Sequence, residues 1–163
     1  RVMGASELKA GVVVASNRAA AGVYADETGA LIEASLRATG FGVLSVTVVP
    51  DGEAVTAAIR ELVDLGARVV ITTGGTGLSP TDRTPEATRQ IIDREVPGIA
   101  EAIRAAGVAK GVSGAALSRG VAGIVDDCLV INLPGSKGGV RDGLAVIEPM
   151  LVHAVEQIRG SDH

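Results

Sequence analysis

The residues with the clearest chemical potential lie in the stretch 72–88, which reads TTGGTGLSPTDRTPEAT. Three glycines in four positions, Gly74, Gly75 and Gly77, leave backbone N–H groups free to approach an anion. Asp82 and a Thr-Pro-Glu helix start come next, and an apolar run precedes the glycines. We interpret the stretch as a strand, a phosphate-sized loop, an acid and a helix N-terminus. Such an arrangement suits a nucleotide-like ligand and a metal ion.

The glycine loop by itself is also consistent with a tight turn between a strand and a helix. It is not a P-loop, because the pattern G-x-x-x-x-G-K-[ST] occurs nowhere in the sequence. It also differs from the dinucleotide-binding fingerprint, since its spacing is G-G-x-G and it follows the third expected strand rather than the first.

Two acids, Asp51 and Asp82, each follow an expected strand. Taken singly, Asp51 is more readily explained as a helix cap and Asp82 as an Asx-turn residue than as catalytic groups. As a pair beside a phosphate-binding loop they favour a magnesium site, because Mg²⁺ is held by one or two carboxylates together with substrate phosphates. Such an ion neutralises charge while a phosphoryl or nucleotidyl group is transferred.

Other reactive side chains give weaker signals. Ser118 and Arg119 precede an expected strand and are equally consistent with a solvated edge and with an anion clamp, since Arg presents a planar fork of donors to phosphate. We interpret His153 and His163 as structural or solvated, and Cys128 as a small buried hydrophobic residue. The sequence therefore predicts no Ser-His-Asp or Cys-His nucleophile.

Strands and helices that alternate along the chain must position these residues. The expected strands are short apolar runs at 9–15, 41–49, 68–73, 121–125 and 128–133. The expected helices are 26–39, 55–63, a segment with Thr84 as N-cap and Pro85 at the first helical position, a segment from Pro97 to about 106, and 140–158 bent at Pro149.

This order predicts one α/β domain over residues 1–163, with a mostly parallel sheet in which the hairpin 121–133 makes one strand antiparallel. Ligands of such sheets bind beyond the carboxyl ends of the strands. The loops 16–18, 50–51 and 74–82 should therefore meet at one edge, while the hairpin leaves the place of the loop 134–136 open.

Composition excludes several classes of function. Hydrophobic residues make up 47% of the chain but aromatic residues only 1%, so the base-stacking surface typical of single-stranded nucleic-acid binding is lacking. A net charge of −4 and a pI near 5.2 argue against duplex binding. The single cysteine fits a reducing compartment, and no apolar run approaches the ~18 residues of a membrane span. We expect a cytoplasmic protein without nucleic-acid or membrane partners.

Five motifs in chain order, TTGGTG, DRTPEAT, DREVPG, LSRG and NLPGS, resemble the MogA/MoaB family of molybdenum-cofactor biosynthesis, which is related to the gephyrin N-terminal domain. The resemblance extends from Val12 to about Ile158. It implies a three-layer α/β/α fold, a homotrimer and molybdopterin adenylyltransferase activity. In that reaction ATP and molybdopterin give adenylyl-molybdopterin and pyrophosphate with magnesium. It also implies handover to a molybdate-inserting partner of the MoeA type.

The resemblance also assigns roles to residues of this sequence. The family's two functional aspartates, which serve catalysis and the metal, fall on Asp51 and Asp82. Its nucleotide loop falls on Gly74, Gly75, Thr76 and Gly77. Its second nucleotide-contacting turn falls on Pro134, Gly135 and Ser136. The segment near the pterin phosphate falls on Ser118 and Arg119.

The chain departs from the family pattern in three places. In the first loop it has Ser16-Asn17-Arg18, as MoaB-type members do, whereas many MogA sequences have Ser-Asp-Arg. It has Thr81 at the position before the second aspartate, where the family often has a basic residue. It has Ser136-Lys137 where the family motif Pro-Gly-x-Pro has x-Pro. The first departure leaves two functions open, an active adenylyltransferase and a non-catalytic MoaB-type molybdopterin carrier, whereas the other two concern individual ligand contacts and not the fold. A purely structural trimer is disfavoured, because a scaffold does not require polar strand-exit loops.

Overall fold

The structure of the chain is a computed structural model that describes residues 8–17 and 22–160, with backbone alone for 22–26. The predicted loop residue Arg18 and the terminal His163 lie outside the described residues.

Within this part of the chain, six strands form one sheet in the order β2-β1-β3-β6-β5-β4. Their bounds are β1 (Lys9–Ala15), β2 (Gly42–Val49), β3 (Val69–Thr73), β4 (Arg94–Glu95), β5 (Ala122–Val125) and β6 (Cys128–Leu133). β1 pairs in parallel with β2 and β3, and β3 with β6, whereas β5 is antiparallel to both β6 and β4. The predicted sheet with one antiparallel strand is confirmed, and β4 is a strand that the sequence analysis missed.

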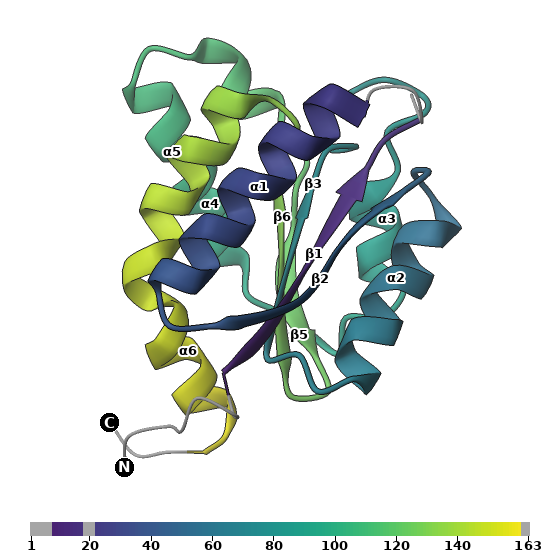
Figure 1. Ribbon diagram of the computed structural model, residues 1–163. Coiled ribbons are helices and arrows are strands. Elements are labelled where there is room, and N and C mark those ends of the chain that lie inside the picture. The colour runs from purple at the N-terminus through teal and green to yellow at the C-terminus, as the bar shows by residue number, and fades with distance from the viewer. Residues whose placement is uncertain (1–7, 18–21, 161–163) are drawn as a thin grey trace.

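Helices cover both faces of the sheet. Their bounds are α1 (Gly22–Ala38), α2 (Glu53–Asp64), α3 (Thr84–Arg89), α4 (Pro97–Ala109), α5 (Lys137–Ile147) and α6 (Leu151–Ile158), with short 3₁₀ segments η2 (Ser113–Leu117) and η3 (Glu148–Met150). Figure 1 shows α1, α4, α5 and α6 on one side and α2 and α3 on the other. The three-layer α/β/α architecture is therefore confirmed.

Alternate side chains of each central strand supply two separate aliphatic cores. Val12 and Val14 of β1 pack with α1, α4, α5 and α6, whereas Val13 packs with α2 and α3. This is the period of two that a strand buried on both faces requires. Cys128 belongs to the second core, and burial raises the pKa of its thiol to about 12, so its predicted structural role is confirmed.

Two local predictions were wrong. Thr84 is not the N-cap of α3: Arg83 holds that position, and the Thr84 hydroxyl instead donates a hydrogen bond to Asp51 Oδ1 at 3.0 Å. The closing helix is not one bent element but two helices separated by η3, which contains Pro149. A proline has no N–H for the helical ladder, so the α-helix ends there instead of bending.

The carboxyl ends of the four parallel strands meet at one edge of the sheet. The Asn17 side chain donates to Thr81 O at 3.3 Å, which joins the loops after β1 and β3. The Thr73 hydroxyl donates to Pro134 O at 2.7 Å, which joins the loops after β3 and β6. The predicted convergence holds for the described residues and includes the loop whose place was open. No helix among the described residues is long and apolar enough to cross a membrane.

Candidate functional site

The loop after β3 has a backbone that only glycine accommodates. Gly74 and Gly75 adopt φ values of +89° and +68°, in the left-handed region that side chains rarely occupy. A Cβ at Gly74 would lie 2.4 Å from Ala15 O, and one at Gly75 would lie 2.2 Å from Asp51 Oδ2. The glycines thus let the loop backbone lie directly against the end of β1 and against Asp51, which follows β2.

Asp51 ties the end of β2 to the start of α3. Its Oδ1 accepts hydrogen bonds from Gly52 N at 2.8 Å and from the Thr84 hydroxyl at 3.0 Å, and its Oδ2 accepts from Arg83 N at 3.0 Å. Asp51 therefore lies directly behind the Gly75 backbone and holds the loop and α3 together. It does not cap α2, whose N-cap residue is Gly52.

Asp82 closes the same loop but keeps one oxygen available. Its Oδ2 accepts from Ser79 N at 3.1 Å, which is the Asx-type turn considered from the sequence. Among the described residues Oδ1 has no hydrogen-bond partner. A Cβ at Gly77 would lie 2.8 Å from Oδ2, so this glycine lets the carboxylate approach the loop backbone. Asp82 thus fixes the turn through one carboxylate oxygen, while the other oxygen has no partner among the described residues.

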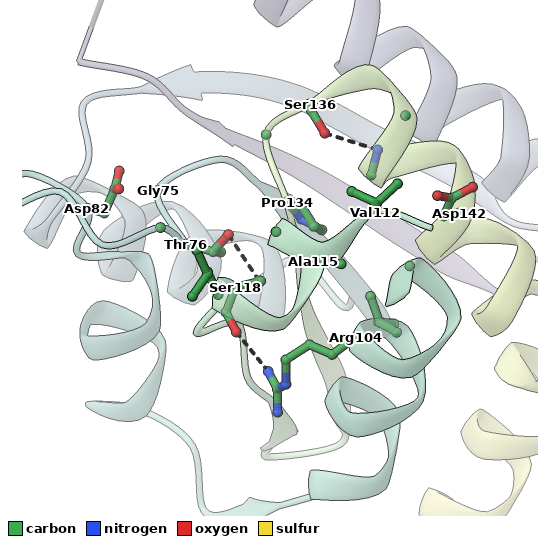
Figure 2. Close-up of a pocket in the computed structure, with 18 residues that line it drawn as sticks. Gly75, Thr76, Asp82, Arg104, Val112, Ala115, Ser118, Pro134, Ser136 and Asp142 are labelled. Carbon is green, nitrogen blue, oxygen red and sulfur yellow. Dashed lines mark hydrogen bonds between the residues drawn. The ribbon is translucent and has the colours of Figure 1, made fainter. Parts of the chain in front are cut away.

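The glycine loop, α4, η2 and the start of α5 enclose a pocket of about 510 Å³ (Figure 2). Eight residues proposed from the sequence line it: Gly75, Thr76, Gly77, Asp82, Ser118, Pro134, Gly135 and Ser136. Gly74, Asp51 and Arg119 are not among its lining residues. The structure therefore brings both predicted nucleotide-binding turns and one predicted aspartate to a common cavity, with the remaining three residues behind its wall.

The start of α5 forms one wall of this pocket. Ser136 is the N-cap of α5, its hydroxyl accepts from Gly139 N at 3.0 Å, and Gly138 and Gly139 line the cavity beside it. The partial positive charge at a helix N-terminus favours anions. The sequence analysis expected this role from the helix after the glycine loop, but the first residues of α3 do not line the pocket.

Arg119 braces the glycine loop from outside the pocket. Its Nε donates to Gly77 O at 2.9 Å, its Nη2 to Asp82 O at 2.8 Å, and its backbone N to Thr76 O at 2.8 Å. Nη1 donates to Glu86 Oε2 at 2.6 Å. This hydrogen bond holds the pKa of Glu86 below its ordinary value and raises the pKa of Arg119. The guanidinium is therefore committed to fixing the loop that carries Asp82.

Ten of the eighteen residues that line the pocket were missed by sequence reasoning, among them Arg104, Asp142, Ile103 and Val112. Arg104 on α4 donates to Ser118 O at 3.2 Å and to Gly120 O at 2.9 Å, and none of the ion pairs among the described residues includes it. Asp142 on α5, Ile103 on α4 and Val112 before η2 line the cavity as well. Their only sequence signals were helical spacing and the small-residue stretch 107–116, and neither indicates which face meets a ligand.

The two sides of the pocket differ in polarity. The side formed by the glycine loop and the start of α5 contributes backbone, hydroxyl groups and Asp82. The opposite side, formed by α4, η2 and the residue before η2, contributes the apolar side chains of Ile103, Val112, Ala115 and Leu117 together with Arg104. In residues 8–17 and 22–160 no group of three or more His, Cys, Asp or Glu side chains is placed to hold a metal ion. A cavity with one apolar wall and a few convergent polar groups is typical of a small-molecule site.

Comparison with known proteins agrees with this geometry. The family model described as a probable molybdopterin binding domain matches residues 11–153, which span most of the chain. The chain belongs to this family. The resemblance to MogA and MoaB proteins is therefore confirmed.

Solved structures of both types resemble this chain. The molybdopterin biosynthesis Mog protein from Mycobacterium ulcerans is 49% identical, with a TM-score of 0.86 over 92% of this chain and 98% of that one. The molybdopterin biosynthesis enzyme MoaB from Thermus thermophilus is 41% identical, also with a TM-score of 0.86, over 94% of this chain and 98% of that one. Similarity of fold therefore does not separate the two types.

Among curated proteins, the molybdopterin adenylyltransferase of Haemophilus influenzae is 39% identical over 141 residues, which cover 84% of this chain and 71% of that protein. Two bacterial relatives named molybdenum cofactor biosynthesis bifunctional protein match 93% of this chain. The chain spans about half the length of these two relatives, 48% and 49%.

Proposed function

We propose that this chain is a molybdopterin adenylyltransferase of molybdenum-cofactor biosynthesis. The observation that carries the proposal is the pocket in which the glycine loop, Asp82 and the start of α5 face an apolar wall. Its polar side suits phosphates and its apolar side suits a planar ring. The family and the adenylyltransferase from Haemophilus influenzae support the assignment of substrates, ATP and molybdopterin.

In this proposal the phosphates of ATP bind to the loop Gly74–Gly77 and to the turn Pro134–Ser136. The two segments are in contact, since a Cβ at Gly135 would lie 3.1 Å from the Gly74 Cα. Backbone N–H groups of such turns form anion-binding concavities without any charged side chain. The Ser118 hydroxyl, which is 3.4 Å from the Thr76 hydroxyl, would meet the pterin phosphate at the same side of the pocket.

The residues present fit a magnesium ion that is held mainly by substrate. Asp82 lines the pocket and has one carboxylate oxygen without a partner among the described residues. Asp51, with three hydrogen bonds to its carboxylate, fits a supporting role more readily than direct ligation. Magnesium commonly takes one or two carboxylates and completes its shell with phosphates and water. When bound, it would neutralise charge on the reacting phosphates.

The reaction needs little acid–base chemistry from the protein. An oxygen of the terminal phosphate of molybdopterin attacks the α-phosphorus of ATP and forms a new P–O bond. The bond from the α-phosphorus to the bridging oxygen breaks, and pyrophosphate leaves with that electron pair. The attacking phosphate is already ionised at pH 7. None of the described residues that line the pocket is a histidine, and in this proposal the residues contribute by positioning the reactants and by stabilising charge.

The proposal includes a homotrimer in the cytoplasm that passes its product to a molybdate-inserting protein of the MoeA type. These elements follow from the family resemblance. The protein itself provides small-molecule recognition, and no nucleic-acid or membrane partner is part of the proposal.

A second candidate function is that of a non-catalytic MoaB-type carrier. One observation favours it: Asn17 accepts from Asp51 N at 3.2 Å through Oδ1 and donates to Thr81 O at 3.3 Å through Nδ2. Asparagine at this position is the residue of MoaB-type members. The aspartate of many MogA sequences could not make the second hydrogen bond, because an ionised carboxylate only accepts.

Incubation of the purified protein with ATP, molybdopterin and magnesium distinguishes the two functions. The adenylyltransferase forms adenylyl-molybdopterin and pyrophosphate in equal amounts, and chelation of magnesium stops both. A carrier binds the pterin tightly but releases no pyrophosphate, and that result would contradict the first proposal.

A further inference from the structure

Asp142 is a second carboxylate of the pocket, and the reaction proposed above does not use it. It lies on α5, its side chain is 18% exposed, and it lines the cavity. Its Oδ1 accepts from Lys110 Nζ at 2.8 Å. Its Oδ2 has no hydrogen-bond partner among the described residues. A partly buried carboxylate with one open oxygen in a ligand-sized pocket is available for recognition.

Asp142 lies on the same face of α5 as the glycines that line the pocket at the start of this helix. Gly138, Gly139 and Asp142 line the same cavity, and their spacing of three and four residues places them on one face of α5. Asp142 lies five residues after Lys137, the first residue of α5, and therefore about 7.5 Å along the axis from the start of the helix. Figure 2 shows Asp82 and Asp142 at opposite ends of the pocket.

The space between the two acids has an apolar wall. Ile103 and Val112 line the cavity there, and Ala115 packs so closely on α4 that a Cβ at Gly107 would lie 2.5 Å from the Ala115 Cβ. Gly107 thus lets η2 lie against α4, so that Ala115 forms part of this apolar surface. A planar heterocycle that rests on this surface would direct an edge toward Asp142.

The chemistry of a carboxylate decides which heterocycle fits that end. An ionised carboxylate accepts hydrogen bonds and donates none. The pyrimidine edge of a pterin presents two neighbouring donors, the ring N3–H and the 2-amino group. The corresponding edge of adenine presents one amino donor beside a ring nitrogen that is itself an acceptor, which would face a carboxylate oxygen unfavourably. The Lys110 ammonium balances the charge of Asp142, so a neutral ring edge suits this end of the pocket.

We propose that Asp142 is a specificity-determining residue that binds the N3–H and 2-amino edge of the pterin ring and so places the pterin, not the adenine, at the α4–α5 end of the pocket. This inference rests on the proposed function, because it assumes that the pocket takes a pterin.

A pair of ring analogues tests the proposal. The probes are 6-hydroxymethylpterin and 6-hydroxymethyllumazine, in which an oxygen replaces the 2-amino group and turns a donor into an acceptor. We expect calorimetric titration to show that the wild-type protein prefers the pterin by about 10-fold or more, the size expected for a hydrogen bond to a charged group. Asp142→Asn should lose most of this preference and leave the affinity for ATP within about twofold.

Two control variants separate recognition from charge. Lys110→Met removes the ammonium but keeps the carboxylate, and it should keep the preference for the pterin. Glu101→Gln removes one negative charge from an exposed position on α4 that does not line the pocket, and it should bind both rings as the wild type does.

The proposal is overturned if Asp142→Asn keeps the wild-type preference, or if the wild type binds both rings equally or binds neither up to about 1 mM. Its failure is distinguishable from failure of the proposed function. If Asp142→Asn loses the preference while the wild type forms no adenylyl-molybdopterin, ring recognition stands and the adenylyltransferase fails. If the wild type turns over but the variant keeps the preference, the adenylyltransferase stands and this role of Asp142 fails.

Discussion

At the scale of single residues, the two aspartates that the sequence singles out have different surroundings. Asp51 uses its carboxylate to bind two backbone N–H groups and the Thr84 hydroxyl, whereas Asp82 bonds one N–H and faces the pocket. Loss of Asp51 should therefore disturb the loop itself, while loss of the Asp82 charge should disturb chemistry with little change in fold. The sequence analysis treated the two aspartates as one pair and gave no means to separate their surroundings, because the separation depends on contacts with residues 83 and 84.

We predict that Asp82→Asn lowers turnover by at least ~100-fold, the size expected for losing one preorganised electrostatic element. The amide oxygen can still accept from Ser79 N, so the loop should keep its shape. The measurement is kcat for adenylyl-molybdopterin formation together with the thermal unfolding midpoint. Near-normal turnover in a folded variant would remove Asp82 from the reaction.

The Glu86–Arg119 pair predicts a small pH dependence of stability. The hydrogen bond from Arg119 lowers the pKa of Glu86, so the stabilisation is present above the ordinary value of 4.5 and is lost as pH falls through the lower folded value. The Glu86 side chain is 50% exposed, so the contribution should be at most about 1 kcal/mol.

Denaturant unfolding of the wild type and Glu86→Gln at pH 7 and pH 3 measures this effect. The difference in free energy of unfolding between the two proteins should be larger at pH 7 than at pH 3. A difference that is the same at both pH values would show that the pair does not act through the charge of Glu86.

At the scale of elements, the glycine loop depends on both its backbone conformation and its close approach to Asp51. We predict that Gly75→Ala weakens ATP binding by at least ~10-fold and destabilises the protein by about 1–3 kcal/mol, because a Cβ would overlap Asp51 Oδ2 in addition to the strain of a positive φ. The affinity for ATP and the denaturation midpoint report the two effects.

Gly111 offers a matched control for this prediction. It has φ +90°, and a Cβ built on it meets nothing within 4 Å. Gly111→Ala therefore introduces the backbone strain without the overlap and should keep ATP affinity near the wild-type value. Equal losses in both variants would mean that the contact with Asp51 is unimportant.

Elements with a strong local pattern were predictable, and those set by tertiary contacts were not. β1 has the predicted bounds because an unbroken aliphatic run has few alternatives to a buried strand. β4 was missed because its two residues are exposed and charged, and its pairing depends on Gly123, where a Cβ would lie 2.7 Å from Arg94 O. The Thr84 cap was wrong because a distant carboxylate competes for the hydroxyl.

The pocket shows the same division. Its glycine loop follows a strand of the expected parallel sheet, so its place at one edge was predictable. The place of the Pro134–Ser136 turn was left open, because it depends on the parallel pairing of β6 with β3. Asp142 and Val112 have no such marker, because their part in the site depends on how α4, η2 and α5 pack together. A carboxylate on a helix of ordinary amphipathic pattern is indistinguishable, in sequence, from one on a solvated face.

At the scale of the whole molecule, the homotrimer is a prediction that follows from the family resemblance. Light scattering coupled to gel filtration should give about three times the 16.3 kDa of this chain, independent of loading concentration. A monomeric mass at every concentration would contradict it.

The central claim is that the pocket transfers an adenylyl group. The most direct measurement is the formation of adenylyl-molybdopterin and pyrophosphate from molybdopterin and ATP, with and without magnesium, by the wild type and by Asp82→Asn. The account predicts stoichiometric, magnesium-dependent formation of both products by the wild type and a loss of at least ~100-fold in the variant. Tight binding of molybdopterin with no pyrophosphate released by the wild type would contradict it and leave the chain as a carrier.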